Sequence, residues 1–233
     1  MASDWKPFAL THITYPVDGS IYTPILALLS LLPSFGVCAL VSAVVIYKDV
    51  CSLYLLVGSL ISTVISAILK RLIREPRPER YDDDIDDIEF GMPSNHSCFA
   101  WFVTTFVVMY VVKRGTVWAA SNLPSRCCYK YPRNKTETPM RHYMLLLAKL
   151  WSVLHSSVTI ILALCIAGGC SYSRVYLRYH TPAQVYAGSV LGMGLGAFWY
   201  YLFQTKLVRD LLILVDATIY ELEHQRVMQQ KRD

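Results

Sequence analysis

Five long stretches of this chain contain no Asp, Glu, Lys or Arg, and they constrain its fold more than any other feature. They cover 19–47, 50–69, 90–112, 150–173 and 179–205. Each is close in length to the ~20 residues with which a helix crosses a bilayer. A hydrophobic content of 54%, gathered in blocks, excludes a typical soluble domain. The sequence predicts an all-α integral membrane protein with about five transmembrane helices.

The apolar stretches and their flanking charges set the expected helix boundaries. Spans are predicted near 24–47, 51–72, 97–113, 144–168 and 182–204. Because no repeat, linker or second domain is evident between them, 1–233 is expected to form a single membrane domain. The tail at 205–233 is too charged to cross a bilayer and is predicted to be an amphipathic segment on the cytoplasmic surface.

Four local signals predict how these helices are arranged. Pro33 lies inside the first span and is expected to kink it. A very short turn at Lys48 and Asp49 makes the first two spans an antiparallel hairpin. His155, in the fourth span, is expected to be a hydrogen-bonded group of the bundle interior. The fifth span has a glycine at every fourth position, which lets helices approach closely; these are Gly188, Gly192 and Gly196.

The basic residues indicate membrane topology rather than nucleic-acid binding. The net charge is +5, but Lys and Arg lie in loops beside the spans and form no nucleic-acid motif. With five spans, one side holds the N-terminus, 70–89 and 174–178, with 8 Lys and Arg, and the other holds 48–49, 113–149 and the tail, with 14. The positive-inside rule makes the second side cytoplasmic and the first lumenal or external. The N-terminus lacks the pattern of a cleaved signal peptide, so the first span is predicted to be an uncleaved signal anchor.

Three polar stretches lie on the predicted lumenal side of the spans, at 70–78, 93–97 and 173–184. Taken alone, the arginines of the third stretch fit a juxtamembrane loop that reaches lipid headgroups. Together, the stretches supply two histidines, three cations and a serine. Ionisable groups beside membrane segments mark a functional site by default. The candidate residues are Lys70, Arg77, Ser94, His96, Arg174 and His180.

This set of side chains suits phosphoryl transfer. Charge develops on the equatorial oxygens of a transferring phosphoryl group, and fixed cations, a hydroxyl and a helix N-terminus stabilise it. One imidazole can attack phosphorus while the other protonates the leaving oxygen, because histidine titrates near neutral pH.

The same residues form three ordered motifs that resemble the type 2 phosphatidic acid phosphatase (PAP2) superfamily. The motifs are Lys70-x6-Arg77-Pro78, Pro93-Ser94-x-His96 and Ser173-Arg174-x5-His180. The resemblance implies a PAP2-like bundle in which His180 is the nucleophile and forms a phosphohistidine. It implies that His96 protonates the leaving group and then activates water. It further implies a phosphate clamp without a metal or other cofactor, and the predicted phosphate-binding residues are Lys70, Arg77, Ser94, Asn95 and Arg174.

Two positions depart from the superfamily pattern. Asn95 stands where glycine is usual, which restricts the backbone beside the phosphate. Gln184 stands where an aspartate usually orients and charges the nucleophilic histidine. The carbonyl of Gln184 can accept the imidazole N–H, but it cannot stabilise an imidazolium electrostatically. Gln184 is therefore placed beside His180 and His96 among the predicted catalytic residues.

Within that superfamily the chain is similar to the dolichyldiphosphatases, which carry glutamine at this position. The likeness rests on 10–16, 91–97 and 171–185. It implies hydrolysis of dolichyl diphosphate, a polyprenyl lipid, to dolichyl phosphate and phosphate, which recycles the carrier for protein N-glycosylation. It also implies a multi-pass protein of the endoplasmic reticulum membrane, with a lumenal active site and a cytoplasmic C-terminus.

Two other functions stay open. The clamp recognises phosphate and not the lipid tail, so phosphatidic acid or a sphingoid phosphate is an alternative substrate. A catalytically silent membrane scaffold is the other alternative, because Gln184 is neutral. The C-x5-R spacing of Cys127 and Arg133 lacks the glycines of a phosphate-binding loop. The acidic run at 82–89 is interpreted as a solvated loop, and the sequon at Asn134 is predicted to lie in the cytoplasm.

Overall fold

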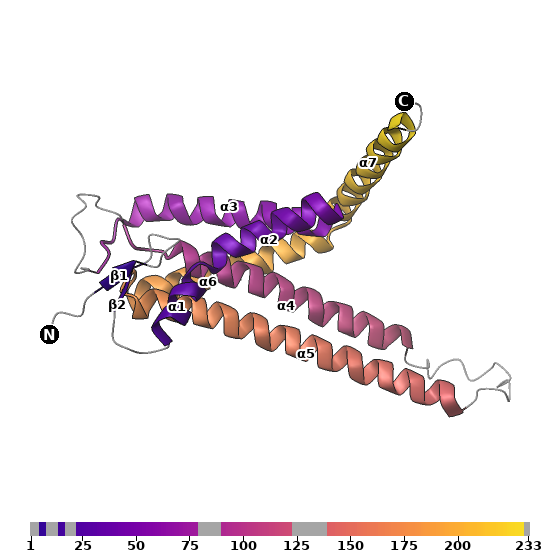
Figure 1. Cartoon of the computed structure of the whole chain (residues 1–233), viewed down its shortest axis with the longest axis horizontal. Helices are drawn as coiled ribbons and strands as arrows, with labels where there is room; N and C mark the ends of the chain where they lie inside the picture. The colour runs from indigo at the N-terminus through magenta and orange to yellow at the C-terminus, as the bar shows by residue number, and fades with distance from the viewer. Residues whose placement is uncertain (1–4, 8–13, 17–21, 79–89, 123–138, 231–233) are drawn as a thin grey trace. The chain divides into compact units, whose positions relative to one another are not determined.

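The computed structural model describes residues 5–7, 14–16, 22–78, 90–122 and 139–230, and these are almost entirely helical (Figure 1). The elements are the strands β1 (Trp5–Pro7) and β2 (Thr14–Pro16) and the helices α1 (Tyr22–Ser30), α2 (Leu32–Tyr47), α3 (Val50–Ile73), α4 (Asn95–Asn122), α5 (Pro139–Tyr176), α6 (Pro182–Gln204) and α7 (Lys206–Gln230). The predicted helical class is confirmed, with the short antiparallel β1–β2 pair as an addition. The chain divides into two compact units, Met1–Phe106 with Ile166–Asp233, and Val107–Cys165.

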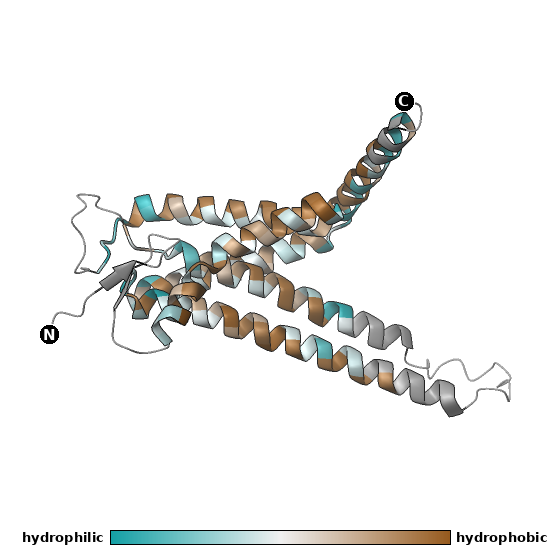
Figure 2. Ribbon diagram, in the orientation of Figure 1, coloured by the Kyte–Doolittle hydropathy of each residue, from teal (hydrophilic) through white to brown (hydrophobic). Residues whose placement is uncertain are grey.

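Three helical segments are long and apolar enough to cross a membrane. They are α3, Asn95–Gly115 of α4 and Leu150–Tyr176 of α5. Apolar residues cover the middle of α5, and hydrophilic ones gather at the last turn of α3 (Figure 2). Helices α1 and α2 pass the same test together as one span bent by 49°. Pro33 lies in the first turn of α2, directly after the bend, and it has no N–H to donate back to α1. The predicted kink is confirmed.

Helix α6 is the fifth predicted span, but it is less apolar than the others. The described residues contain up to four spans by length and composition, and α6 is not among them. Glycine, serine and tyrosine lower its hydropathy. It nevertheless lies antiparallel to α3 along that helix. Gln184, near its start, hydrogen-bonds to Glu75 just beyond α3, and Trp199, near its end, hydrogen-bonds to Tyr54 in the second turn of α3.

A tight turn joins α2 to α3. Lys48 ends α2 in the left-handed conformation, with a φ of 54°. The carboxylate of Asp49 accepts hydrogen bonds from the N–H groups of Cys51 and Ser52, so it caps the N-terminus of α3. The predicted hairpin follows from this reversal, since the two helices pack against each other.

The glycines of α6 form a close, parallel contact with the backbone of α4. A Cβ atom at Gly188 would lie 2.5 Å from the carbonyl oxygen of Ser94, and one at Gly192 would lie 2.2 Å from that of Cys98. At Gly196 the corresponding atom is the carbonyl oxygen of Phe102, at 2.5 Å. Each step of four residues in α6 matches a step of four in α4. The prediction that these glycines permit close helix packing is confirmed, and the contact holds the start of α6 beside the start of α4.

Hydrogen bonds hold α3 antiparallel to α4. Ser62 and Cys98 lie 3.3 Å apart between Oγ and Sγ, and Ser66 donates to the Oδ1 of Asn95 at 2.7 Å. The C-terminal end of α3 therefore meets the N-terminal end of α4. The end of α3, the start of α4 and the start of α6 are distant in sequence, and they thus lie together at one end of these three helices.

Helices α4 and α5 extend past their predicted ends at 113 and 144, to Asn122 and from Pro139. Charged residues such as Lys113 limit the apolar stretch, but they do not end a helix whose backbone satisfies its own hydrogen bonds. Several sequence predictions lie outside the described residues: the acidic run at 82–89, Cys127 with Arg133, and the sequon at Asn134.

Candidate active site

The predicted site residues lie at helix ends and in the chain segments next to those ends. Their positions are the last turns of α3 (Lys70) and α5 (Arg174), the segment after α3 (Arg77), the cap and first turn of α4 (Ser94, Asn95, His96), the loop before α6 (His180) and the first turn of α6 (Gln184). All belong to the same compact unit. Lys70, Arg77 and Arg174 act electrostatically on both His96 and His180, so the fold brings the three predicted cations to the two histidines.

Gln184 is completely buried, and both ends of its carboxamide have hydrogen-bond partners. Its Oε1 lies 3.2 Å from His180 Nδ1 and accepts the backbone N–H of Thr181, also at 3.2 Å. Its Nε2 donates to Glu75 Oε1 at 2.9 Å and to the carbonyl oxygen of Pro76 at 2.8 Å. A primary amide has two N–H donors and two acceptor lone pairs. All four are used, so the orientation of the carboxamide is fixed.

Local sequence explains why Gln184 stands where it does. Thr181 caps α6, and its Oγ1 accepts the N–H of Gln184 at 3.3 Å. In the other direction, Oε1 of Gln184 accepts the N–H of Thr181. This reciprocal pair is a capping box, which Thr-x-x-Gln forms when a helix starts at the next residue. Pro182 at the first helical position reinforces the start. The side chain of Gln184 therefore takes part in the start of α6 and also contacts His180.

The hydrogen bond to Gln184 determines the tautomer of His180. Because Nε2 of Gln184 faces two oxygen acceptors, Oε1 must be the atom that faces His180. Nδ1 of His180 then carries the proton and donates it, which leaves a lone pair on its Nε2. That is the arrangement in which an imidazole acts as a nucleophile through Nε2.

The surroundings of His180 disfavour protonation of its ring. The side chain is 2% exposed. Burial, followed by the positive charges of Arg174, Arg77 and Lys70, lowers the pKa of His180 well below its ordinary value, while the hydrogen bond to Gln184 opposes that shift. Three cations beside an imidazole whose protonation is disfavoured suit the binding of an anion.

Arg174 and Ser94 are held rigidly at the site. Arg174 is buried, and its guanidinium lies 4.0 Å from the ring centroid of Tyr179, a cation–π contact. Its carbonyl oxygen accepts the N–H of His180 at 3.2 Å. Ser94 is completely buried, and its N–H donates to the carbonyl of Gln184 at 3.1 Å. Arg174 is therefore fixed in the His180 loop, and Ser94 is fixed against the start of α6.

Asn95 contacts a neighbouring helix. Its Oδ1 accepts the hydroxyl of Ser66, so part of its side chain links α4 to α3. A phosphate-binding role for Asn95 stays a prediction. Among the residues that the structure describes, no group of three His, Cys, Asp or Glu side chains is placed to hold a metal ion.

Three site residues escaped the sequence analysis. Glu75 contacts Gln184, Tyr179 packs on Arg174, and Thr181 caps α6. The Thr181-x-x-Gln184 spacing after a loop is a readable capping-box signal. Glu75 carries no such signal, because 109 residues separate it from Gln184.

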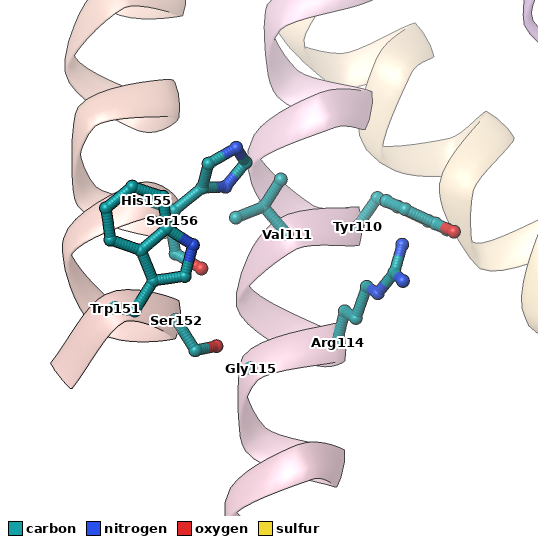
Figure 3. A pocket seen from close by; sticks show the side chains of 8 residues that line it. All are labelled: Tyr110, Val111, Arg114, Gly115, Trp151, Ser152, His155 and Ser156. Atoms are coloured by element: carbon teal, nitrogen blue, oxygen red, sulfur yellow. The ribbon is translucent and has the colours of Figure 1, made fainter. Parts of the chain in front are cut away.

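Away from the predicted site residues, a hollow lies between α4 and α5 inside the Val107–Cys165 unit (Figure 3). It has a volume of about 410 Å³, and Tyr110, Arg114, Trp151 and His155 are among its lining residues. None of the predicted site residues lines it. The prediction that His155 lies in the bundle interior is wrong, since its side chain is exposed at this hollow. The groove between α4 and α5 exposes a histidine ring that the sequence alone placed inside the bundle.

Known proteins resemble this chain over most of its length. Human "Dolichyldiphosphatase 1" is 28% identical over 93% of this chain and 79% of its own. "Lipid phosphate phosphatase gamma" of Arabidopsis thaliana is 29% identical over 87% and 75%, and "Dolichyldiphosphatase" of Saccharomyces cerevisiae is 24% identical over 88% and 72%.

The fold also has a solved counterpart. It is a transmembrane PAP2 type phosphatidylglycerolphosphate phosphatase from Bacillus subtilis, with a TM-score of 0.52, 21% identity, and coverage of 77% of this chain and 75% of that one. At this identity the likeness concerns the fold. The PAP2 superfamily itself matches residues 52–207, a range that contains every predicted site residue. The chain belongs to the PAP2 superfamily.

Proposed function

We propose that this chain hydrolyses dolichyl diphosphate to dolichyl phosphate and phosphate. The observation that carries the proposal is that His96 and His180 share the same three cations, with the ring of His180 oriented by the contact of its Nδ1 with Gln184. Membership of the PAP2 superfamily supports a membrane phosphatase. Relatives named dolichyldiphosphatase, from yeast to human, support a lipid diphosphate as the substrate.

The proposed reaction has two steps. In the first, the Nε2 lone pair of His180 forms a bond to the terminal phosphorus, and the bond from that phosphorus to the bridging oxygen breaks. The bridging oxygen leaves with the electron pair as part of dolichyl phosphate and takes a proton from His96, whose protonated form the negative charge of the bound diphosphate stabilises against the three cations. In the second, His96 takes a proton from water, the water oxygen attacks phosphorus, and the bond to His180 breaks. Lys70, Arg77, Arg174 and Ser94 stabilise the charge on the phosphoryl oxygens.

The neutral Gln184 fits a diphosphate better than a monoester. When a diphosphate is attacked at its terminal phosphorus, the leaving group is a phosphate ester, here dolichyl phosphate. Such a group leaves far more readily than the alkoxide of a monoester, so the nucleophile needs less electrostatic support. A phosphatase for lipid phosphate monoesters is the second candidate, and the similarity to "Lipid phosphate phosphatase gamma" favours it. The predicted lumenal orientation of the site and the cytoplasmic C-terminus belong to the same proposal and rest on the distribution of Lys and Arg.

Phosphate release by the full chain in detergent tests the proposal. Dolichyl diphosphate, phosphatidic acid and a sphingoid phosphate are compared for wild type and His180→Ala. We expect dolichyl diphosphate to be hydrolysed fastest and His180→Ala to lose at least about 10,000-fold in kcat, the scale seen when a nucleophile is removed. An acid-labile, base-stable phosphoenzyme should form in wild type only. Faster hydrolysis of a monoester favours the second candidate, and no turnover with any lipid indicates a silent scaffold.

A further inference from the structure

The Glu75 side chain is held against the site without touching the candidate nucleophile. Its Oε1 accepts the Nε2–H of Gln184 at 2.9 Å, and Gln184 in turn meets Nδ1 of His180. Two hydrogen bonds therefore connect the Glu75 carboxylate to the His180 ring. The superfamily pattern places a carboxylate at position 184, whereas here a neutral amide occupies that position and a carboxylate stands one residue further away.

We infer that Glu75 is a positioning residue that acts on His180 through the Gln184 carboxamide. The inference rests on the proposed function of the same site. Glu75 and the Pro76 carbonyl together present two oxygen acceptors, and these select the orientation in which Gln184 turns Nε2 towards them and Oε1 towards His180. A carboxamide turned the other way would place its oxygen against two acceptors and its N–H groups against the histidine.

The charge of Glu75 also strengthens the acceptor that His180 meets. A carboxylate that accepts an amide N–H draws negative charge onto the amide oxygen, because hydrogen bonds in a chain polarise one another. The ring of His180 gains positive character when its Nε2 bonds to phosphorus. A more negative Oε1 stabilises that ring at Nδ1, which is the task of the aspartate in a Ser-His-Asp triad.

The surroundings indicate that this arrangement is tightly constrained. Gly91 leaves the space that the carboxamide fills, since a Cβ there would lie 2.3 Å from Gln184 Oε1. The N–H of Gly91 donates to the backbone carbonyl of Glu75 at 2.7 Å. That backbone bond does not depend on the Glu75 side chain, so a substitution of the side chain leaves the link between the two segments in place.

Glu75→Gln is the sharpest variant, because it keeps the size of the side chain and an oxygen acceptor but removes the charge. Its matched control is Glu221→Gln on α7, an exposed residue outside the site. We expect kcat for dolichyl diphosphate to fall on the order of 10-fold in Glu75→Gln, with KM within a factor of about two, by analogy with the partners that orient metal-ligating histidines. Glu221→Gln should match wild type. An unchanged kcat in Glu75→Gln overturns the inference.

A double-mutant cycle with Gln184→Ala separates positioning from a general effect of charge. If Glu75 acts through Gln184, the loss caused by Glu75→Gln should disappear when Gln184 is already alanine. The same roughly 10-fold loss in both backgrounds would show that Glu75 acts independently of Gln184. His180→Ala without activity, together with an active wild type, confirms that the assay reports on this site.

The tautomer of His180 gives a readout that does not depend on turnover. In ¹⁵N spectra of histidine-labelled protein, with His180→Ala used to assign the signal, wild type should show a ring protonated at Nδ1. In Glu75→Gln we expect a weaker hydrogen bond at Nδ1 or a second, Nε2-protonated population. A wild-type ring protonated at Nε2 contradicts the inference. An inactive wild type with the expected tautomer contradicts only the proposed function.

Discussion

His180 combines three properties: it is buried, it lies near three cations, and its Nδ1 contacts an amide oxygen. The first two disfavour protonation of the ring, and the third fixes which nitrogen holds the lone pair. In water an imidazole loses its nucleophilic lone pair as it protonates near neutral pH. Burial and the three cations favour the neutral ring of His180, in which Nε2 keeps its lone pair.

This environment predicts how His180 titrates. Because its pKa is lowered, the ring should stay neutral as the pH falls from about 8 to about 5, the range in which an ordinary histidine becomes charged. Its ¹⁵N resonances should therefore not change over that range. Arg174→Gln should raise the pKa of His180, yet leave it below the ordinary value, because burial is the larger cause. Arg178→Gln, an exposed neighbour, is the matched control. Protonation of His180 above about pH 5 in wild type would contradict this prediction.

Single residues also show which contacts could not be predicted from the sequence. The three motifs predicted which segments meet, and the structure brings them together at one end of the helices. Gln184 looked like a weakness because only its charge could be read. Its partners Glu75 and Pro76 lie more than a hundred residues earlier, and no local pattern links them. A second carboxylate at position 184 would face the oxygens of both, which gives glutamine a physical reason to be there.

At the scale of helices, α6 illustrates how packing and hydropathy can disagree. Its four-residue glycine spacing predicted a close contact and the structure confirms it, whereas its predicted role as an apolar span rested on the absence of charge alone. Small residues that let α6 approach the α4 backbone also make it less hydrophobic. The feature that positions Gln184 and Ser94 against each other is thus the same one that weakens the membrane signal of the helix.

The glycine contact predicts a position-specific loss of stability. Gly192→Ala places a methyl group where it would lie 2.2 Å from the Cys98 carbonyl, so the two helices must separate. We expect a cost of about 1–3 kcal/mol and a lower thermal midpoint in detergent. Gly194→Ala, on the same helix with no atom within 4 Å, is the control and should be neutral or stabilising by about 0.5–1 kcal/mol. Equal midpoints for the two variants would mean that the contact does not limit stability.

At the scale of the whole molecule, the positions of the helix ends relate the candidate site and the C-terminal helix to the two sides of the membrane. Hydrogen bonds from Gln184 to Glu75 and from Ser94 to Gln184 require the end of α3 and the starts of α4 and α6 to lie together. The antiparallel course of α6 along α3 then takes its C-terminus, and the start of α7, to the opposite end. If α6 crosses the bilayer despite its lower hydropathy, the active site and the C-terminal helix face opposite compartments.

Glycosylation mapping tests this topology in cells with an endoplasmic reticulum. One version of the chain carries an Asn-x-Thr acceptor with a flexible spacer inside 79–89, and the other carries it after Asp233. We expect a glycan on the first, removable by endoglycosidase, and none on the second, because Lys and Arg are enriched on the side of the tail. The natural sequon at Asn134 should also stay unmodified, and Asn134→Gln removes it as a control. A glycan after Asp233 with none in 79–89 would reverse the orientation, whereas glycans at both positions would mean that α6 does not cross the membrane.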